Sequence, residues 1–168
     1  MDRQLLANFF SFPELINDVA ARLVASTVII TCLLIILFMP INSEFSLYLS
    51  FFLLYEFFAR TSSGPKISLI ALLVTKIIVP KLDLNEKMLP GPPKRFAQFI
   101  GLIFSIAITV FIFLQIQYLA VFFISILVFF ASLEAFLGYC FGCKVFKFLI
   151  LVNLIPKRVC EKCNDLNF

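Results

Sequence analysis

The feature that most constrains this chain is a run of 38 residues without a single charge, from Phe96 to Leu133. As one straight α-helix, the run would be about 57 Å long, nearly twice the roughly 30 Å thickness of a hydrocarbon core. We therefore expect it to cross a bilayer twice. The polar cluster Gln115-Ile116-Gln117-Tyr118 lies near its middle and predicts the turn between the two crossings.

The composition agrees with a membrane protein. Apolar residues make up 62% of the chain and charged residues 14%, whereas a soluble domain has about 45–50% and about 25%. These proportions exclude an ordinary water-soluble domain. Histidine is absent, which excludes His-based catalytic triads and His-ligated metal sites.

Two further apolar segments lie in the N-terminal half. Leu23 to Ser43 is uncharged over 21 residues, which is enough for one crossing. Phe45 to Ala59 has only 15 residues and includes Glu56, but an odd number of crossings would place the basic segments on opposite sides. The sequence thus predicts an all-α integral membrane protein with four transmembrane helices, at about residues 20–41, 45–59, 96–114 and 119–139.

The basic residues predict the orientation. All 14 Lys and Arg residues lie before the first span, between the second and third, or after the fourth, and the two outer turns have none. The positive-inside rule then places both termini and the loop 60–95 in the cytoplasm of a multi-pass protein of the cell membrane. The lipid bilayer is the expected environment, and no nucleic-acid partner is expected; the oligomeric state is left open.

Two shorter apolar stretches follow the second and fourth spans. Residues 67–80 and 145–155 are too short to span a bilayer and too apolar to be solvated, so they are predicted as interfacial helices. The predicted organisation is a four-span membrane domain over 1–156 and a cytoplasmic, cysteine-containing tail over 157–168.

Cys140 and Cys143 form a Cys-x-x-Cys pair at the cytoplasmic end of the fourth span. Such a pair can form a disulfide, exchange thiols or hold a metal. If the helix continues through Cys143, its negative C-terminal end disfavours the thiolate. If Gly138 ends the helix and a new one begins near Gly142, Cys140 lies at a positive helix end close to Lys144, which favours the thiolate.

A second pair, Cys160 and Cys163, lies in the tail. The four cysteines together have the spacing C-x2-C-x16-C-x2-C, which is typical of a tetrathiolate zinc site, although the apolar run between the pairs is unlike a zinc ribbon. Three interpretations stay open: a zinc site, a dithiol relay between the pairs, and inert reduced cysteines. Cys32, inside the first span, is interpreted as a small apolar filler.

Glu134 is the one acidic residue deep in a predicted span. Intramembrane carboxylates are candidates for functional sites. The favoured interpretation is a structural ion pair with Arg22 or Arg60 from the cytoplasmic side. Glu56 and Arg60, four residues apart, are predicted to form a pair within one helix.

Three stretches together carry a family pattern: Arg60 with Gly64-Pro65-Lys66, Pro93-Lys94-Arg95-Phe96-Ala97-Gln98 with Gly101-Leu102, and Glu134-Ala135-Phe136 through Gly138-Tyr139-Cys140-Phe141-Gly142-Cys143. With them, roughly residues 17–148 resemble the family catalogued as domain of unknown function 4395. Its members are small, multi-span and mostly bacterial. The resemblance implies an integral membrane protein without an assigned activity, whose cysteine pair suggests a thiol or sulfur-related role; it does not extend to the tail cysteines.

Two functional hypotheses follow. The first is a membrane dithiol protein that needs no cofactor and exchanges reducing equivalents or sulfur with a cytoplasmic thiol or sulfur-carrier protein through Cys140 and Cys143. The alternative is a non-catalytic membrane scaffold with a zinc-stabilised or partner-docking tail, in which Cys140, Cys143, Cys160 and Cys163 would be the metal ligands. Whether the protein is an enzyme is left open between them.

Overall fold

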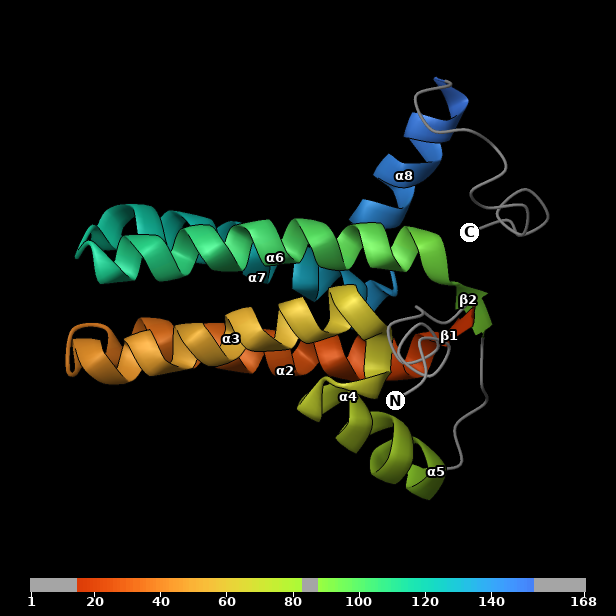
Figure 1. Ribbon diagram of the computed structural model, residues 1–168, viewed down its shortest axis with the longest axis horizontal. Helices are drawn as coiled ribbons and strands as arrows, with labels where there is room; N and C mark the ends of the chain where they lie inside the picture. The colour runs from red at the N-terminus through yellow and green to blue at the C-terminus, as the bar shows by residue number, and fades with distance from the viewer. Residues whose placement is uncertain (1–14, 83–87, 153–168) are drawn as a thin grey trace, which may run out of the picture.

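The computed structural model of the protein describes residues 15–82 and 88–152. Four long helices lie side by side in a bundle (Figure 1): α2 (Asp18–Phe38), α3 (Ser43–Ser63), α6 (Gly91–Phe113) and α7 (Gln117–Leu137). Each is long and apolar enough to cross a membrane. The prediction of an all-α fold with four membrane-spanning helices is confirmed.

The four helices form two hairpins that pack on each other. The turns within the hairpins connect α2 to α3 and α6 to α7, and the second turn lies at residues 114–116, within one residue of the predicted polar cluster. Across the hairpins, α3 packs mainly against α6, and α2 packs mainly against α7. Each helix therefore contacts both its sequence neighbour and a helix from the other hairpin.

The second span is longer than the predicted 45–59. The Asn42 side chain caps the first turn of α3 by accepting a hydrogen bond from the Phe45 amide at 3.1 Å, and Gly64, with φ of 64°, ends the helix. The resulting 21 residues reach about 32 Å, the thickness of a hydrocarbon core. Glu56 and Arg60 do not shorten the helix because both are buried inside the protein.

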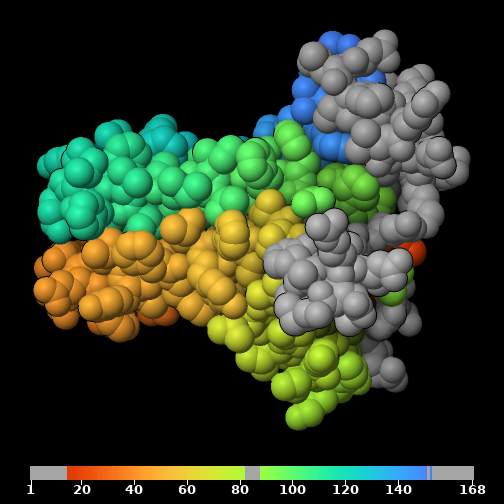
Figure 2. Space-filling view, in the orientation of Figure 1, coloured from red at the N-terminus to blue at the C-terminus, as the bar shows by residue number. Residues whose placement is uncertain are grey.

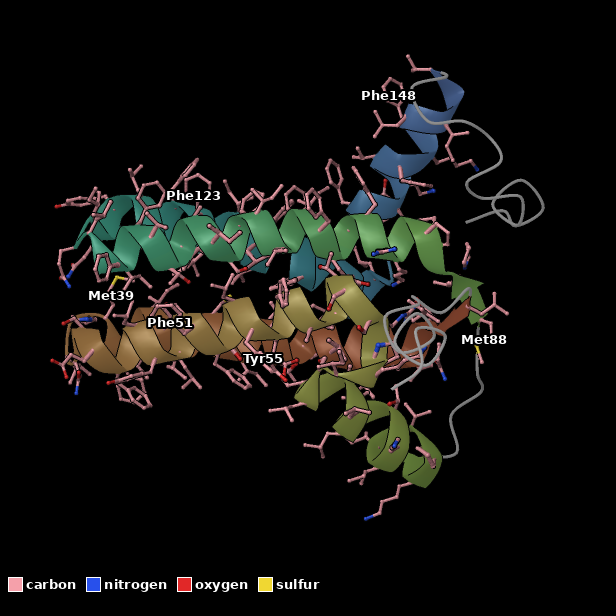
Figure 3. The ribbon with its side chains drawn as sticks, viewed as in Figure 1. Met39, Phe51, Tyr55, Met88, Phe123 and Phe148 are labelled. Carbon is pink, nitrogen blue, oxygen red and sulfur yellow. The ribbon has the colours of Figure 1, made fainter. Side chains whose placement is uncertain are left out.

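Large apolar side chains cover the outside of the bundle, and its core combines apolar side chains such as Ile35 and Leu53 with small ones such as Ala120 and Ser50. Phe51, labelled in Figure 3, and Phe129 are both exposed. Two buried hydroxyl groups connect helices: Ser46 donates to the Ile35 carbonyl at 3.1 Å, and Thr109 donates to the Ser50 carbonyl at 3.3 Å. Such contacts are typical of helix association in lipid, where apolar surface gives no driving force of its own.

Shorter helices project from one end of the bundle, which widens there (Figure 2). The predicted interfacial stretch 67–80 is a helical arm of three parts: α4 (Leu69–Leu73), a π-helical turn (Val74–Ile78) and α5 (Val79–Leu82). The predicted helix 145–155 is α8 (Phe141–Leu151), which begins four residues earlier than expected. Both helical predictions are confirmed, with these bounds.

A two-stranded ribbon at the same end joins the starts of α2 and α6. Strand β1 (Leu15–Asn17) pairs antiparallel with β2 (Met88–Pro90), and Ile16 lies opposite Leu89. The sequence analysis does not predict this ribbon, which brings two segments together from far apart in the chain. The predicted tail, 157–168, lies outside the described residues.

Candidate functional site

Gly138 decides the position of the cysteine pair. It has a left-handed φ of 64°, and its amide and that of Tyr139 donate to the carbonyls of Glu134 and Leu133, which ends α7. This is a common C-terminal cap, and glycine adopts it without strain. A new helix, α8, begins at Phe141 with Cys140 as its N-cap residue. Of the two geometries left open by the sequence, the helix break at Gly138 is the one observed.

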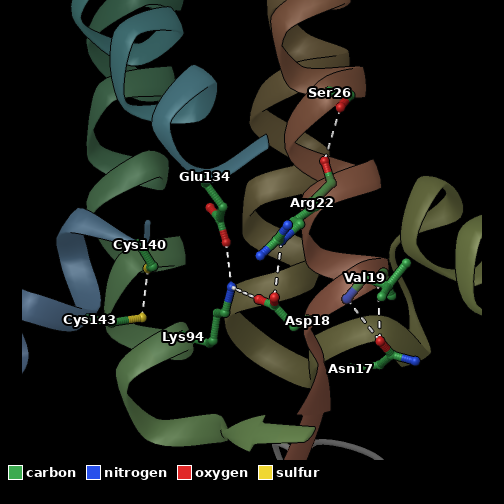
Figure 4. Close-up of polar contacts among 10 residues, drawn as sticks. Asn17, Asp18, Val19, Arg22, Ser26, Lys94, Glu134, Cys140 and Cys143 are labelled. Carbon is green, nitrogen blue, oxygen red and sulfur yellow. Dashed lines mark hydrogen bonds and ion pairs between the residues drawn. The ribbon is translucent and has the colours of Figure 1, made fainter. Parts of the chain in front are cut away.

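The two thiols are in direct contact. Cys143, in the first turn of α8, donates a hydrogen bond from its Sγ to the Sγ of Cys140 at 2.6 Å (Figure 4). Cys140 is only 9% exposed, whereas Cys143 is half-buried. Both are free thiols. A disulfide between them needs only a small approach of two sulfurs that already face each other.

The surroundings make the two thiols unequal. The pKa of Cys140 is lowered, chiefly because Cys143 donates a hydrogen bond to it; the Lys94 ammonium acts in the same direction, against burial and the Glu134 charge. The pKa of Cys143 is raised, because its proton is held in that bond and because it is buried. Cys140 is therefore the thiol that loses its proton more readily, and Cys143 is the one that holds its proton more tightly.

Gly142, between the cysteines, allows α8 to approach α6 closely. A Cβ atom at Gly142 would lie 2.6 Å from the Ala97 Cβ and 2.7 Å from the Ala97 Cα. Real Cβ atoms do not approach other carbons so closely, so a larger residue would force the two helices apart. Gly142 thus serves the packing that holds the dithiol against the bundle.

We expect Gly142→Ala to lower the free energy of unfolding by about 1–3 kcal/mol, the range for overpacked sites. The measurement is denaturant unfolding of detergent-purified protein. In the double variant Gly142→Ala/Ala97→Gly, the clashing Ala97 methyl is absent, so part of the loss should return. Equal stability of Gly142→Ala and the unchanged protein would contradict the close approach of α8 to α6.

Charged groups beside the dithiol form a partly buried network, in which Lys94 and Asp18 are buried and the Arg22 side chain is 41% exposed. Lys94 lies between two carboxylates, with its Nζ 2.6 Å from Glu134 Oε1 and 3.7 Å from Asp18 Oδ1 (Figure 4). Asp18 also accepts a hydrogen bond from Arg22 Nε at 3.0 Å. The expectation that Glu134 pairs with Arg22 or Arg60 is therefore wrong. The β1–β2 ribbon holds the starts of α2 and α6 together, which brings Lys94 close to Asp18, and Lys94 contacts Glu134 because α6 packs against α7.

The predicted pair within α3 is also corrected. The Glu56 carboxylate accepts hydrogen bonds from the Ser68 hydroxyl and from the amides of Leu69 at 3.0 Å and Ile70 at 3.4 Å, so it caps α4. Arg60 instead donates from Nε to the Glu56 backbone carbonyl at 3.0 Å. Because α4 folds back onto α3, its open amide groups reach the carboxylate. Glu56 is thus a structural residue that joins the helical arm to the bundle.

Two cavities meet at Cys140. The first, here called the end pocket, has a volume of about 220 Å³ and contains both cysteines. Its charged lining consists of Asp18, Arg22, Lys94, Lys144 and Lys147. The second, here called the bundle cavity, has about 320 Å³, lies among all four long helices, and has Arg60, Gln98, Glu134 and Cys140 at its polar end. Cys140 lines both cavities, whereas Cys143 lines only the first.

The described residues do not test the zinc interpretation. Within residues 15–82 and 88–152, no three Cys, Asp or Glu side chains are grouped so that they could hold a metal ion. Cys160 and Cys163, which that interpretation requires, lie outside the described residues. Cys32 is fully buried among the apolar side chains of the bundle core, as expected of a small filler.

Comparison with known proteins gives a family. No curated protein and no solved structure matches this chain. The family described as a domain of unknown function (DUF4395) matches residues 16–150, which include the four long helices, Lys94, Glu134 and the dithiol. Since this match covers most of the chain, the protein belongs to the DUF4395 family of proteins of unknown function.

Proposed function

We propose that the protein is a membrane dithiol protein that exchanges reducing equivalents with a partner thiol protein through Cys140 and Cys143. The observation that carries the proposal is the pair itself: an N-cap Cys140 that accepts a hydrogen bond from Cys143 at 2.6 Å, beside the Lys94 ammonium, in a pocket at the end of the bundle. This arrangement combines an activated thiolate, a second thiol within reach, and space for a reacting group.

The exchange takes two steps. The Cys140 thiolate attacks a disulfide of the partner, so that a mixed disulfide forms and one partner sulfur leaves as a thiolate. Cys143 then attacks the Cys140 sulfur, closes the internal disulfide and releases the second partner sulfur, which takes up the Cys143 proton. The protein loses two electrons and the partner disulfide gains them. The same steps in reverse reduce the internal disulfide. If the partner carries a persulfide, the Cys140 thiolate attacks its outer sulfur, the S–S bond of the partner breaks, the partner thiolate leaves, and Cys140 holds the sulfur as a persulfide.

The end pocket favours a partner with negative charge. Four basic residues line it: Arg22, Lys94, Lys144 and Lys147. Arg22 pairs with Asp18 and Lys94 with Glu134, so Lys144 and Lys147 give the pocket its excess of positive charge. A positive surface around a reactive thiol attracts acidic partners and raises their association rate. We therefore infer a partner whose reactive sulfur is surrounded by acidic side chains.

The cytoplasmic side is the proposed location of this pocket. The helical arm, α8 and the dithiol all lie at one end of the bundle, and the segments that carry the basic residues of the sequence begin there. The positive-inside rule supports a cytoplasmic position for that end and for both termini. In a variant with Cys160 and Cys163 replaced by serine, a membrane-impermeant maleimide should then label Cys140 in inverted vesicles and leave it unlabelled in intact cells; the reverse pattern would overturn the orientation.

The replacement Cys143→Ser tests the proposed function. It removes the resolving thiol, so we expect a mixed disulfide between Cys140 and the partner to accumulate in cells and to appear on a non-reducing gel after acid trapping. The tail cysteines are replaced by serine in the background, so that any adduct must form at Cys140 or Cys32. The matched control Cys140→Ser/Cys143→Ser should give no adduct.

The pH dependence of alkylation provides a second measurement. Because the pKa of Cys140 is lowered, its alkylation should reach half its maximal rate at a lower pH than that of a free thiol. Cys143→Ser retains a hydroxyl donor, whereas Cys143→Ala does not, so the alanine variant should need a higher pH. If Cys143→Ser forms no adduct and Cys140 titrates as a free thiol, the dithiol proposal is wrong, and zinc in stoichiometric amount in the full chain would then favour the scaffold.

A further inference from the structure

We propose that the bundle cavity binds the head group of a lipid-soluble quinone, which exchanges two electrons with the dithiol. This inference rests on the proposed function, because it names the second substrate of the same cysteine pair. The end pocket would serve the protein partner, and the bundle cavity would serve the membrane carrier. Cys140 is the residue that lines both.

The position and walls of the bundle cavity suit an apolar occupant. It lies within the membrane-spanning helices, and its volume of about 320 Å³ is at the lower end of the usual range for small-molecule sites, roughly 300–1,000 Å³. Its apolar walls come from all four long helices and include Val24, Val28, Phe57, Phe104, Leu127 and Phe130. An occupant that partitions into lipid would match these walls.

Two buried polar atoms at one end of the cavity have no hydrogen-bond partner in the described part of the chain. They are Nη2 of Arg60, a residue that is only 5% exposed, and Oε1 of Gln98. Both residues also line a smaller pocket of about 140 Å³. Buried polar groups are nearly always paired, so an unpaired donor and an unpaired acceptor point to a polar occupant, and of the two spaces the larger bundle cavity is the one that also contains Cys140. Arg60 is otherwise held by its bond to the Glu56 carbonyl and by the Phe57 ring, 4.4 Å away.

A quinone supplies the complementary groups in both of its redox states. The oxidised form has two carbonyl oxygens, one of which can accept a hydrogen bond from Arg60 Nη2. The reduced form has hydroxyl groups, one of which can donate to Gln98 Oε1. A fatty acid also offers an acceptor to Arg60 but neither a donor for Gln98 nor any redox chemistry for Cys140.

The redox step balances with one proton from the solvent. The Cys140 and Cys143 sulfurs form one disulfide bond, and the pair loses two electrons together with the one proton that Cys143 carries. The quinone gains the two electrons, that proton and a second proton from the solvent, which took up the Cys140 proton when that thiol ionised, so that each of its carbonyl groups becomes a hydroxyl group. Exchange with the protein partner then regenerates the dithiol. Run in reverse, the same step draws electrons from the hydroquinone.

Direct binding tests the cavity separately from the thiol chemistry. The probes are a benzoquinone and a naphthoquinone, each with one isoprenoid unit, titrated by calorimetry into the detergent-purified Cys140→Ser/Cys143→Ser protein, in which no electron transfer can occur. We expect saturable binding of at least one quinone. Arg60→Met should weaken it at least tenfold, whereas Arg95→Met, at an exposed arginine outside the cavity lining, should leave it unchanged.

Because Arg60→Met could impair folding, Ala131→Leu serves as an independent variant. Ala131 lines the cavity, and a leucine there would occupy part of its volume, so quinone binding should be lost while the unfolding midpoint stays close to that of the parent. No saturable quinone binding, binding that is indifferent to both variants, or stronger binding of a C16 fatty acid than of either quinone would overturn the inference.

With the cysteines restored, each quinone reduced should yield one internal disulfide, counted by loss of free thiols. The rate of disulfide formation by quinone is then compared between the parent and Ala131→Leu. A rate at least tenfold lower in Ala131→Leu supports the inference, and an unchanged rate opposes it. The Cys143→Ser adduct does not depend on this cavity. If that adduct forms and quinones do not bind, only the quinone inference fails; if quinones bind and no adduct forms, the thiol-exchange proposal fails.

Discussion

Replacing Lys94 with methionine is expected to lower the free energy of unfolding by about 3–5 kcal/mol, the range for breaking one side of a buried ion pair. The Lys94 side chain is only 3% exposed, and it neutralises Glu134 at 2.6 Å and Asp18 at 3.7 Å. Methionine fills similar volume but leaves the Glu134 carboxylate buried without its cation. Denaturant unfolding in detergent measures the effect.

The companion variants separate charge from packing. Glu134→Gln should cost less than Lys94→Met, because Lys94 keeps Asp18 as a partner. Lys94→Met/Glu134→Gln should be more stable than Lys94→Met alone, since no unpaired carboxylate remains. Lys81→Met, at an exposed lysine, is the control and should change little. If Lys94→Met and Lys81→Met have equal stability, the partly buried network does not hold the bundle together.

The same Lys94→Met substitution should act on the dithiol. The Lys94 ammonium lowers the pKa of Cys140, so its loss raises that pKa and moves the alkylation profile of Cys140 to higher pH. At neutral pH a smaller fraction of Cys140 is then thiolate. The structural network and the proposed reaction site therefore share one residue.

Replacing Glu56 with alanine should release the helical arm from the bundle. The carboxylate accepts three hydrogen bonds at the start of α4. A hydrogen bond to a charged group contributes about 1.5 kcal/mol, so the loss of only two of them would destabilise the docked arm by about 3 kcal/mol. The Leu69 and Ile70 amides should lose protection from hydrogen exchange by about a hundredfold. Mass spectrometry of the peptides that cover α4 measures this loss.

Glu44→Ala provides the matched control for Glu56→Ala. Glu44 lies in the first turn of the same helix but is exposed, so its removal should leave the exchange of α4 unchanged. Glu56→Gln retains an acceptor oxygen without the charge and should give an intermediate loss. Protection of α4 that is the same in Glu56→Ala and Glu44→Ala would show that the arm is held by its apolar contacts with Ala20 and Val24 alone.

The membrane-spanning helices could be predicted from the sequence because lipid leaves a chain few options. Every backbone polar group must be paired inside the bilayer, so a long uncharged run such as Phe96–Leu133 has to form helices that cross it. The turn residues and the two surface helices follow from the same local rule. The helix break at Gly138 could be stated as an alternative but not decided, because a single glycine also occurs inside helices.

The partners of the buried charges could not be predicted in the same way. Glu134 pairs with Lys94, which is 40 residues away, and Glu56 caps a helix that begins 13 residues later. Both partnerships depend on where helices meet in space, and spacing along one helix carries no information about that. The structure starts the third helix at Gly91, which places Lys94 in its first turn, and the β1–β2 ribbon brings that turn to Asp18.

The sequence alone determined that this chain is a four-span membrane protein with a Cys-x-x-Cys pair after its last span, because hydrophobic length and residue spacing are local properties. Only the tertiary structure decided that the pair lies at the start of a helix, beside Lys94, where two cavities meet. The physical reason is that activation of a thiol depends on the charges and donors within a few ångströms of its sulfur. Here two of them, Lys94 and Glu134, come from helices other than the one that carries Cys143.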